Sequence, residues 1–274
     1  MKVTRSSGAL GAEISGIDLA ADHAPATVGE LRRLWLEHLV LFFHDQDLAP
    51  DRFLALARSF GEPMDYPFLK GLDDFPQITI VAKLEHETVN FGGIWHSDTT
   101  YLPAPPSATM LLAREVPRHG GDTLFANQYL AYETLPPQLK RRIDGLKGVS
   151  TSAKADTTRS REDRVRDSGR HGVTEEFHAV HPAVRTHPET GRKALYVNPA
   201  HTARFDGMSE EASAPLLAEL FAHQVEPQFR CRFAWRAGSL ALWDNRCTLH
   251  NPVNDYPGYR RVMHRITLKG DVPA

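Results

Sequence analysis

The sequence contains little cysteine and no long apolar run, and its charges nearly balance. Cys231 and Cys247 are the two cysteines among 274 residues, too few for a disulfide framework, so a reducing cytoplasm is the expected location. The longest apolar run, residues 39–43, is much shorter than the ~20 residues that cross a bilayer. A net charge of −2 provides no general attraction to nucleic acid or to an anionic membrane. We therefore expect neither as a partner, and whether the two cysteines pair stays open.

Helical patterns are few and lie mostly near the ends of the chain. In the first segment apolar residues recur every three or four positions, as one buried stripe requires. A second segment starts with Pro50 and stops at Gly61, and a third starts with Ser209, a good N-cap that two glutamates follow. Shorter helical pieces are expected on either side of Pro136 and Pro137. The three longer helices are predicted at residues 27–39, 50–61 and 209–221.

Short segments rich in β-formers make up much of the remaining sequence. Many strands without helices between them favour an antiparallel sandwich or barrel over a parallel doubly wound sheet. The predicted fold is therefore mainly β with flanking helices. No clean linker interrupts the sequence, so we predict a single domain over residues 1–274. The strands are predicted at residues 77–82, 108–112, 123–127, 178–187, 193–198, 228–235, 239–245 and 261–268.

One polar segment stands apart from this pattern. Residues 150–174 are rich in arginine and almost without large apolar side chains. A connection of this length in a compact domain is usually either a functional lid or a disordered loop. We predict a lid or mobile loop here, and a solvated loop explains the composition equally well.

The run WHSD, residues 95–98, places an imidazole and a carboxylate two positions apart. If the run is extended, His96 and Asp98 project from the same face. Such a pair suits either general acid–base catalysis or the binding of a divalent metal. His250 follows an apolar strand and a polar turn about 150 residues later. Two histidines and one carboxylate on one face of a metal form the ligand set of non-haem Fe(II) oxygenases, in which the other positions stay open.

Two arginines after His250 provide a candidate anchor for an anionic co-substrate. Arg261 and Arg265 lie four apart in one predicted strand and hence on one face, whereas Arg260 faces the opposite way. A guanidinium can hold a carboxylate by two parallel hydrogen bonds. Because an unpaired buried charge is strongly unfavourable, a buried arginine at this place needs an anionic partner.

The candidate metal and co-substrate residues lie in four short motifs, which are WHSD (95–98), PRHGGDTLFAN (117–127), WDNRCTLH (243–250) and YRRVMHR (259–265). In their order and spacing they resemble the TauD/TfdA family, the taurine dioxygenase group of Fe(II)/2-oxoglutarate-dependent dioxygenases. The resemblance covers nearly the whole chain. It implies a double-stranded β-helix (jelly-roll) core wrapped by helices and inserts, and because members of the family often self-associate, we expect a homo-oligomer.

The resemblance also implies a chemistry. His96, Asp98 and His250 match the iron ligands of the family, which makes them both the metal-binding and the catalytic residues. The implied cofactor is Fe(II), and the implied co-substrates are 2-oxoglutarate and O₂. A small-molecule substrate is hydroxylated while 2-oxoglutarate is converted into succinate and CO₂. Arg261 matches the arginine that binds the distal carboxylate of 2-oxoglutarate, and Thr123 matches the hydroxyl that assists it.

The expected substrate-binding residues are Tyr66, Asn90, Thr99, Tyr196 and Arg265. Arg265 matches an arginine that lies close to both the co-substrate and the anionic head group of the substrate. Tyr66 and Gly92 stand where taurine-oxidising members carry a histidine and an asparagine, with Asn90 nearby, so taurine itself is not expected. We predict a sulfonate, a sulfate ester or an aryloxy or alkyl carboxylate as the substrate.

Three alternatives stay open. The same chemistry could serve a biosynthetic hydroxylation or desaturation of an amino-acid-like substrate. A zinc-dependent hydrolase could use the same three ligands, but it would need no carboxylate anchor such as Arg261. A non-catalytic jelly-roll binding protein would be expected to have lost at least one of these side chains, and all of them are present.

Overall fold

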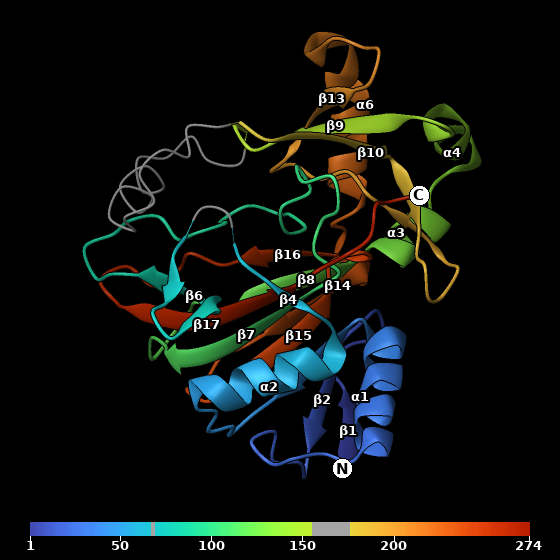
Figure 1. The fold of residues 1–274 in the computed structure, drawn as a ribbon. Helices are drawn as coiled ribbons and strands as arrows, with labels where there is room; N and C mark the ends of the chain where they lie inside the picture. The colour runs from blue at the N-terminus through green and yellow to red at the C-terminus, as the bar shows by residue number, and fades with distance from the viewer. Residues whose placement is uncertain (67–68, 155–175) are drawn as a thin grey trace.

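The computed structural model describes residues 1–66, 69–154 and 176–274, and two facing β-sheets form its centre (Figure 1). Strands distant in the sequence are neighbours in both sheets, and apart from one parallel pair, between residues 12–13 and 41–42, all pairs are antiparallel. The larger sheet consists, in order, of β1 (Lys2–Arg5), β2 (Ala12–Ser15), β3 (Val40–Phe43), β15 (Leu240–Asp244), β7 (Ala108–Glu115), β17 (Arg261–Leu268), β6 (Phe75–Lys83) and β5 (Gly71–Leu72), and β4 (Pro63–Met64) pairs with β17. The smaller sheet consists of β14 (Arg230–Phe233), β8 (Thr123–Asn127) and β16 (Thr248–Pro252).

Alternation along the central strands builds a core on both faces of the larger sheet. In β15, Leu240 and Leu242 pack on the outer face, whereas Ala241 and Trp243 pack on the inner face against the smaller sheet. Such strands have no polar face, because both of their sides are buried. In β17 the apolar pattern changes: Ile266 lies on the outer face, but the inner face carries arginines as well as Met263. The space between the two sheets therefore contains charged groups.

Helices α1 (Pro25–His38) and α2 (Pro50–Phe60) cover the outer face of the larger sheet (Figure 1). Each starts with a proline, whose missing N–H is not needed in the first turn. Helix α1 ends at His38, and the next residue, Leu39, adopts the left-handed conformation (φ 66°) and leads directly into β3. Trp35 and Phe60 contact each other edge to face, with ring centroids 6.3 Å apart.

A second group of elements packs beside the two facing sheets and has its own apolar cluster. Asn127 caps α3 by accepting hydrogen bonds from the backbone N–H groups of Tyr129 and Leu130, and Ser209 caps α6. This group contains the three-stranded sheet β10 (His178–Pro182), β9 (Lys147–Thr151) and β13 (Thr202–Phe205), the pair β11 (Val184–Thr186) and β12 (Lys193–Leu195), and the helices α3 (Gln128–Glu133), α4 (Pro137–Ile143) and α6 (Glu210–His223).

The mainly β architecture with flanking helices, predicted from the sequence, is confirmed. The three longer predicted helices are present with ends shifted by up to two residues. Three predicted strands are wrong in extent: residues 178–187 form two strands separated at Ala183, residues 228–235 begin with a 3₁₀ helix (Pro227–Phe229), and residues 193–198 are extended only to Leu195. Of the predicted lid or loop at 150–174, residues 155–174 lie outside the described residues, and Ser150 and Thr151 end β9.

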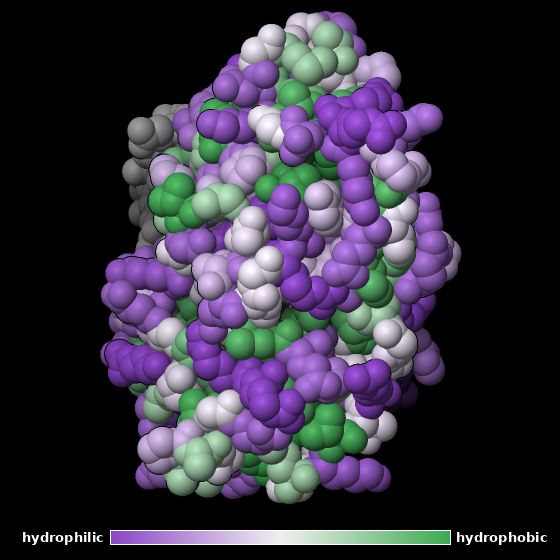
Figure 2. All heavy atoms as spheres, turned by 90° about the vertical axis from the view of Figure 1, so that its right-hand side faces the viewer, coloured by the Kyte–Doolittle hydropathy of each residue, from purple (hydrophilic) through white to green (hydrophobic). Residues whose placement is uncertain are grey.

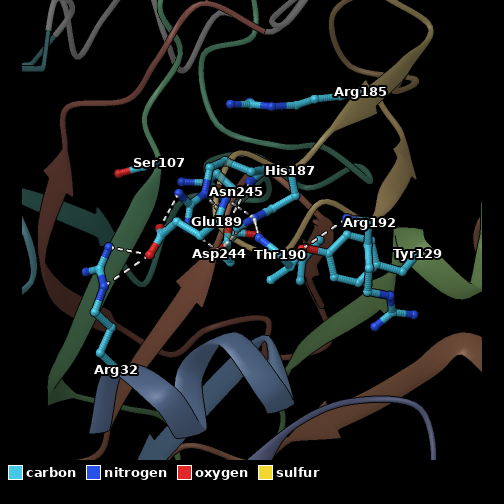
Figure 3. Close-up of polar contacts among 12 residues, drawn as sticks. Arg32, Ser107, Tyr129, Arg185, His187, Glu189, Thr190, Arg192, Asp244 and Asn245 are labelled. Carbon is cyan, nitrogen blue, oxygen red and sulfur yellow. Dashed lines mark hydrogen bonds and ion pairs between the residues drawn. The ribbon is translucent and has the colours of Figure 1, made fainter. Parts of the chain in front are cut away.

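A buried polar network ties the turn after β15 to α1 (Figure 3). Arg246 donates to both carboxylate oxygens of Asp244, at 2.9 and 2.7 Å, and to Glu189 at 2.7 Å. Asp244 also contacts His187 Nε2 at 3.0 Å, and Glu189 accepts from Arg32 of α1. His187, Asp244 and the nearby Cys247 could in principle hold a metal ion. Because a guanidinium engages both oxygens of Asp244, the cluster is instead a structural ion pair.

Replacing Glu189 by glutamine tests the outer part of this network. Burial alone would raise the pKa of Glu189, but the hydrogen bonds and charges of Arg246 and Arg32 hold that pKa below its usual range. The carboxylate therefore stabilises the fold above its unfolded-state pKa, and this contribution is lost as the pH falls through the folded-state pKa. Glu189→Gln should lower the free energy of unfolding by about 1 kcal/mol at neutral pH.

Urea unfolding between pH 7 and pH 3 measures this effect, and the difference between Glu189→Gln and the wild type should shrink as the solution becomes acidic. Glu219→Gln is the matched control, because Glu219 pairs with Arg142 where both side chains are about half exposed. A constant difference at every pH would show that the charge of Glu189 does not contribute.

On the face shown in Figure 2, hydrophilic side chains predominate and apolar ones occur in small groups. Within the described ranges, no helix has both the length and the apolar character needed to span a membrane.

Candidate metal and co-substrate site

The structure brings His96, Asp98 and His250 together although the sequence separates them widely. His250 lies in β16, and its backbone forms an antiparallel bridge with His96, with N–H···O distances of 3.0 and 2.8 Å. The Nε2 atoms of the two histidines lie 3.7 and 3.9 Å from Asp98 Oδ1. All three ligand-type atoms lie within 4.8 Å of one another. This spacing suits one ion held at ~2 Å from each atom.

Burial sets the protonation states that a metal needs. Burial lowers the pKa of His96 and holds that of His250 well below its usual range, so both imidazoles are neutral ligands at pH 7. Burial alone would raise the pKa of Asp98, but His250, Arg265 and His96 outweigh it and hold this pKa at about 2. His96 Nδ1 lies 2.7 Å from the carbonyl oxygen of Ile94. Since a carbonyl only accepts, Nδ1 carries the proton and Nε2 faces the candidate metal position.

Arg261 and Thr123 lie at the inner side of the two sheets and fit a carboxylate. Arg261 is 6% exposed, and its Nε and Nη2 atoms have no hydrogen-bond partner in the described part of the chain. Unmade hydrogen bonds of a buried cation are costly. The hydroxyl of Thr123 accepts from Trp235 Nε1 at 2.9 Å, so it can donate its own proton to an anion. Burial lowers the pKa of Arg261, but a guanidinium remains charged at neutral pH.

Arg265 lies between the metal ligands and an aromatic wall. Its guanidinium carbon is 4.1 Å from the centroid of the Tyr66 ring, and its Nη1 is 3.9 Å from Asp98 Oδ1. The Nε and Nη2 atoms are buried without a partner among the residues that the structure places. Arg260, as predicted from alternation, faces the other way and lies 3.4 Å from Glu115 near the surface.

A pocket opens directly over His96 and Asp98 and is lined mainly by apolar and aromatic side chains. The space between its lining atoms, with adjoining open solvent included, is about 480 Å³. Of the residues predicted to bind substrate, Tyr66 and Thr99 line it. Thr99 adopts a left-handed conformation (φ 43°), which is uncommon for a β-branched residue and often marks a functional site. The lining residues that sequence reasoning missed are Phe91, Ile94, Tyr101, Ala200 and His201.

Of the other three predicted substrate contacts, Arg265 is not a lining residue itself but packs against the lining residue Tyr66, and Asn90 and Tyr196 lie away from the pocket. Asn90 is buried, and its amide donates to the carbonyl of Pro252 at 3.0 Å. Tyr196 packs near His181 and Arg185, at 5.9 and 5.0 Å from its ring centroid. Gly92 does line the pocket, and a Cβ there would lie 2.9 Å from the imidazole of His96. Glycine at position 92 therefore makes room for the imidazole of His96.

The cysteines contribute to packing. Cys231 and Cys247 are both buried and free, so the open question of their pairing is resolved in favour of two thiols. Burial raises the pKa of the Cys231 thiol to about 12 and that of Cys247 well above its usual range. Both thiols are thus protonated and unreactive at neutral pH.

A jelly roll that carries two histidines, one carboxylate and an arginine with unpaired donors defines the class of 2-oxoglutarate-dependent metalloenzymes. A family model described as "Taurine catabolism dioxygenase TauD, TfdA family" matches residues 2–267. The chain belongs to this family. It is accordingly a 2-oxoglutarate-dependent dioxygenase, with Fe(II) as its metal and with 2-oxoglutarate and O₂ as co-substrates.

Individual relatives match along almost their whole length. The chain is 34% identical to the alpha-ketoglutarate-dependent sulfate ester dioxygenase of Pseudomonas putida, over 97% of this chain and 89% of the relative. It is 31% identical to the alpha-ketoglutarate-dependent 2,4-dichlorophenoxyacetate dioxygenase of Cupriavidus pinatubonensis, over 95% and 94%. Among solved structures, a putative alpha-ketoglutarate-dependent taurine dioxygenase from Burkholderia xenovorans superposes with a TM-score of 0.85 at 33% identity, covering 100% of this chain and 94% of that one. The jelly-roll prediction is thereby confirmed.

Proposed function

We propose that the protein hydroxylates a small anionic molecule with an apolar body, of the class of sulfate esters, sulfonates and aryloxy or alkyl carboxylates. The observation that carries this proposal is Arg265, a buried cation with two unpaired donor atoms beside a metal-ligand carboxylate and an aromatic wall. An anionic head group would satisfy these donors. Support also comes from the two relatives above, because their named substrates are a sulfate ester and an aryloxyacetate.

His96, Asp98 and His250 are the residues that would hold the iron, which with 2-oxoglutarate supplies the oxidising power for hydroxylation of a C–H bond. Three protein ligands on one side leave the opposite side for co-substrates. Arg261 would hold the distal carboxylate of 2-oxoglutarate by two hydrogen bonds, and the Thr123 hydroxyl would donate a third. Fixing the far end of the co-substrate in this way orients its other end toward the metal.

The pocket lining explains the preference for an apolar body. Phe91, Ile94 and Tyr101 provide aromatic and aliphatic surface in the pocket that His96 and Asp98 also line. Among the described residues, the lining offers no carboxylate to a substrate ammonium group apart from that of Asp98, which the metal requires. Thr99 Oγ1 is buried without a partner within the described residues, so it can bond to a polar substrate atom. Such a pocket binds the amphiphilic anion better than it binds taurine.

The experiment is a substrate panel with matched neutral analogues. The Fe(II)-loaded protein is incubated with alkyl sulfates, alkanesulfonates and aryloxyacetates, and each anion is compared with the corresponding alcohol or amide. We expect the anions to raise succinate formation at least tenfold above the rate without substrate, with about one product molecule per succinate, and we expect the neutral analogues to have little effect. Succinate formation that no anion raises would refute the proposed substrate class.

Two controls separate the proposed oxygenase function from a zinc hydrolase and from a biosynthetic enzyme that acts on amino acids. A zinc hydrolase would act equally well under nitrogen, whereas this protein should lose all turnover without O₂. Amino acids in the same panel test the biosynthetic alternative, which predicts that they are the better substrates.

We propose that residues 1–274 act as one domain, that residues 150–174 include a lid or mobile loop, and that the enzyme works in the cytoplasm on a small molecule rather than on nucleic acid or at a membrane. Self-association into a homo-oligomer is tested by light scattering on the purified protein.

A further inference from the structure

The two carboxylate oxygens of Asp98 have different surroundings. Oδ1 faces the two ligand histidines and Arg265, at 3.7, 3.9 and 3.9 Å. Oδ2 points the other way and accepts a 2.5 Å hydrogen bond from the hydroxyl of Thr109, in β7. The carboxylate is 4% exposed and Thr109 is fully buried, so no water competes with this contact.

Thr109 is in turn held by a chain of hydrogen bonds that runs in one direction. The Asn245 amide donates to Thr109 Oγ1 at 2.8 Å, and Asn245 Oδ1 accepts from Trp243 Nε1 at 2.9 Å. An indole nitrogen can only donate, so Trp243 fixes which end of the Asn245 amide carries oxygen. The amide nitrogen therefore faces Thr109, and the single hydroxyl proton of Thr109 is left for Asp98.

The backbone around these hydrogen-bonded side chains is also held in place. Asn245 accepts a 2.6 Å hydrogen bond at its carbonyl from Ser97, the residue between the ligands His96 and Asp98, and its own N–H donates to the carbonyl of Ser107 at 3.0 Å. In the larger sheet, Trp243 lies directly opposite Thr109. Two neighbouring strands thus present a rigid hydrogen-bond donor at a defined place behind Asp98.

We propose that Thr109, set by Asn245 and Trp243, is a positioning residue that makes Asp98 bind the metal through Oδ1 alone. A carboxylate with both oxygens free can turn and occupy two coordination positions, and that would close a position that a co-substrate needs. The Thr109 hydrogen bond removes Oδ2 from the metal. This inference rests on the metal site of the proposed function, and it assigns a task to residues outside the ligand set.

The test compares Thr109→Val, which keeps the shape of the side chain but removes the hydroxyl, with Thr109→Ser, which keeps the hydroxyl. Mn²⁺ affinity is measured by calorimetry without co-substrate or substrate. Partners that orient a ligand are typically worth 10–100-fold in metal affinity, so Thr109→Val should bind Mn²⁺ about 10–100-fold more weakly, and Thr109→Ser should stay within about threefold of the wild type. The visible absorption spectrum of the Co²⁺-loaded Thr109→Val protein should also change, because a second carboxylate oxygen would take a position that solvent holds in the wild type.

Thr248→Val is the matched control, because it removes a buried hydroxyl that donates at 2.6 Å to the carbonyl of Asp244 and does not touch Asp98. If Thr109→Val fails to fold, Thr109→Ala removes the same hydrogen bond with less steric demand, and the comparison with Thr109→Ser is made on it. Wild-type Mn²⁺ affinity and an unchanged Co²⁺ spectrum in the variant without the hydroxyl would overturn the inference. The proposed function fails separately, if the wild-type protein forms no succinate with any substrate.

Discussion

Arg261→Met should weaken the binding of 2-oxoglutarate by about 2–5 kcal/mol, which is a loss of roughly 30-fold or more in affinity. The side chain is 6% exposed and two of its donor atoms have no partner in the described part of the chain. We therefore expect the distal carboxylate of the co-substrate to pair with this charge. Methionine keeps much of the volume and removes the charge. Calorimetric titration of the Mn²⁺-loaded protein with 2-oxoglutarate measures the effect without turnover.

The neighbouring arginine provides the control. Arg260→Met removes an equal charge one position away, but Arg260 is close to half exposed and lies 3.4 Å from Glu115 at the surface, so the affinity should stay within about twofold. Pyruvate provides a second control, because it has the keto acid end of 2-oxoglutarate without the distal carboxylate. Its affinity should be the same for Arg261→Met and the wild type. An unchanged affinity for 2-oxoglutarate would mean that another residue holds its distal end.

Asp98→Ala should abolish substrate-dependent succinate formation. Removing partners that only orient a ligand costs 10–100-fold in metal affinity or activity, and removing the ligand itself should cost more. The change removes the one anionic ligand, whose pKa of about 2 keeps it charged at all working pH values. It also leaves Arg265 without its nearest carboxylate. Mn²⁺ calorimetry and a coupled succinate assay measure the two losses.

Asp74→Ala serves as the control for Asp98→Ala, because Asp74 is exposed in the turn before β6. Far-UV circular dichroism shows whether the Asp98 variant keeps its fold. A folded Asp98→Ala protein that retains wild-type turnover would remove Asp98 from the metal ligands.

The clustering of the candidate metal and co-substrate groups could be predicted from the sequence because short local patterns carry these residues. Alternation in one strand places Arg261 and Arg265 on one face regardless of what surrounds them, and the structure agrees. The His96–Asp98 spacing also predicted that the two side chains converge, but strand alternation is not the cause. The segment is turn-rich rather than a regular strand, and its backbone bridge to His250 brings the three side chains together.

The substrate pocket and the residues behind Asp98 could not be predicted in the same way. Phe91 and Ile94 come from one loop and His201 from another that is distant in the sequence, and no local pattern shows that these two loops meet. Thr109 looks like an ordinary β-former within an apolar strand, and only the register between β7 and β15 places its hydroxyl behind a carboxylate. Tyr196 illustrates the opposite case, since a motif match predicted a contact that the fold directs elsewhere.

The backbone bridge between His96 and His250 has a consequence for how the apoprotein behaves. Two hydrogen bonds already join the segments that carry the histidines, so an arriving ion does not have to gather distant parts of the chain. When iron binds or leaves, side-chain atoms then replace solvent on the ion or are replaced by it, and the backbone of these segments keeps its conformation. We therefore expect the iron-free protein to be preorganised for metal binding.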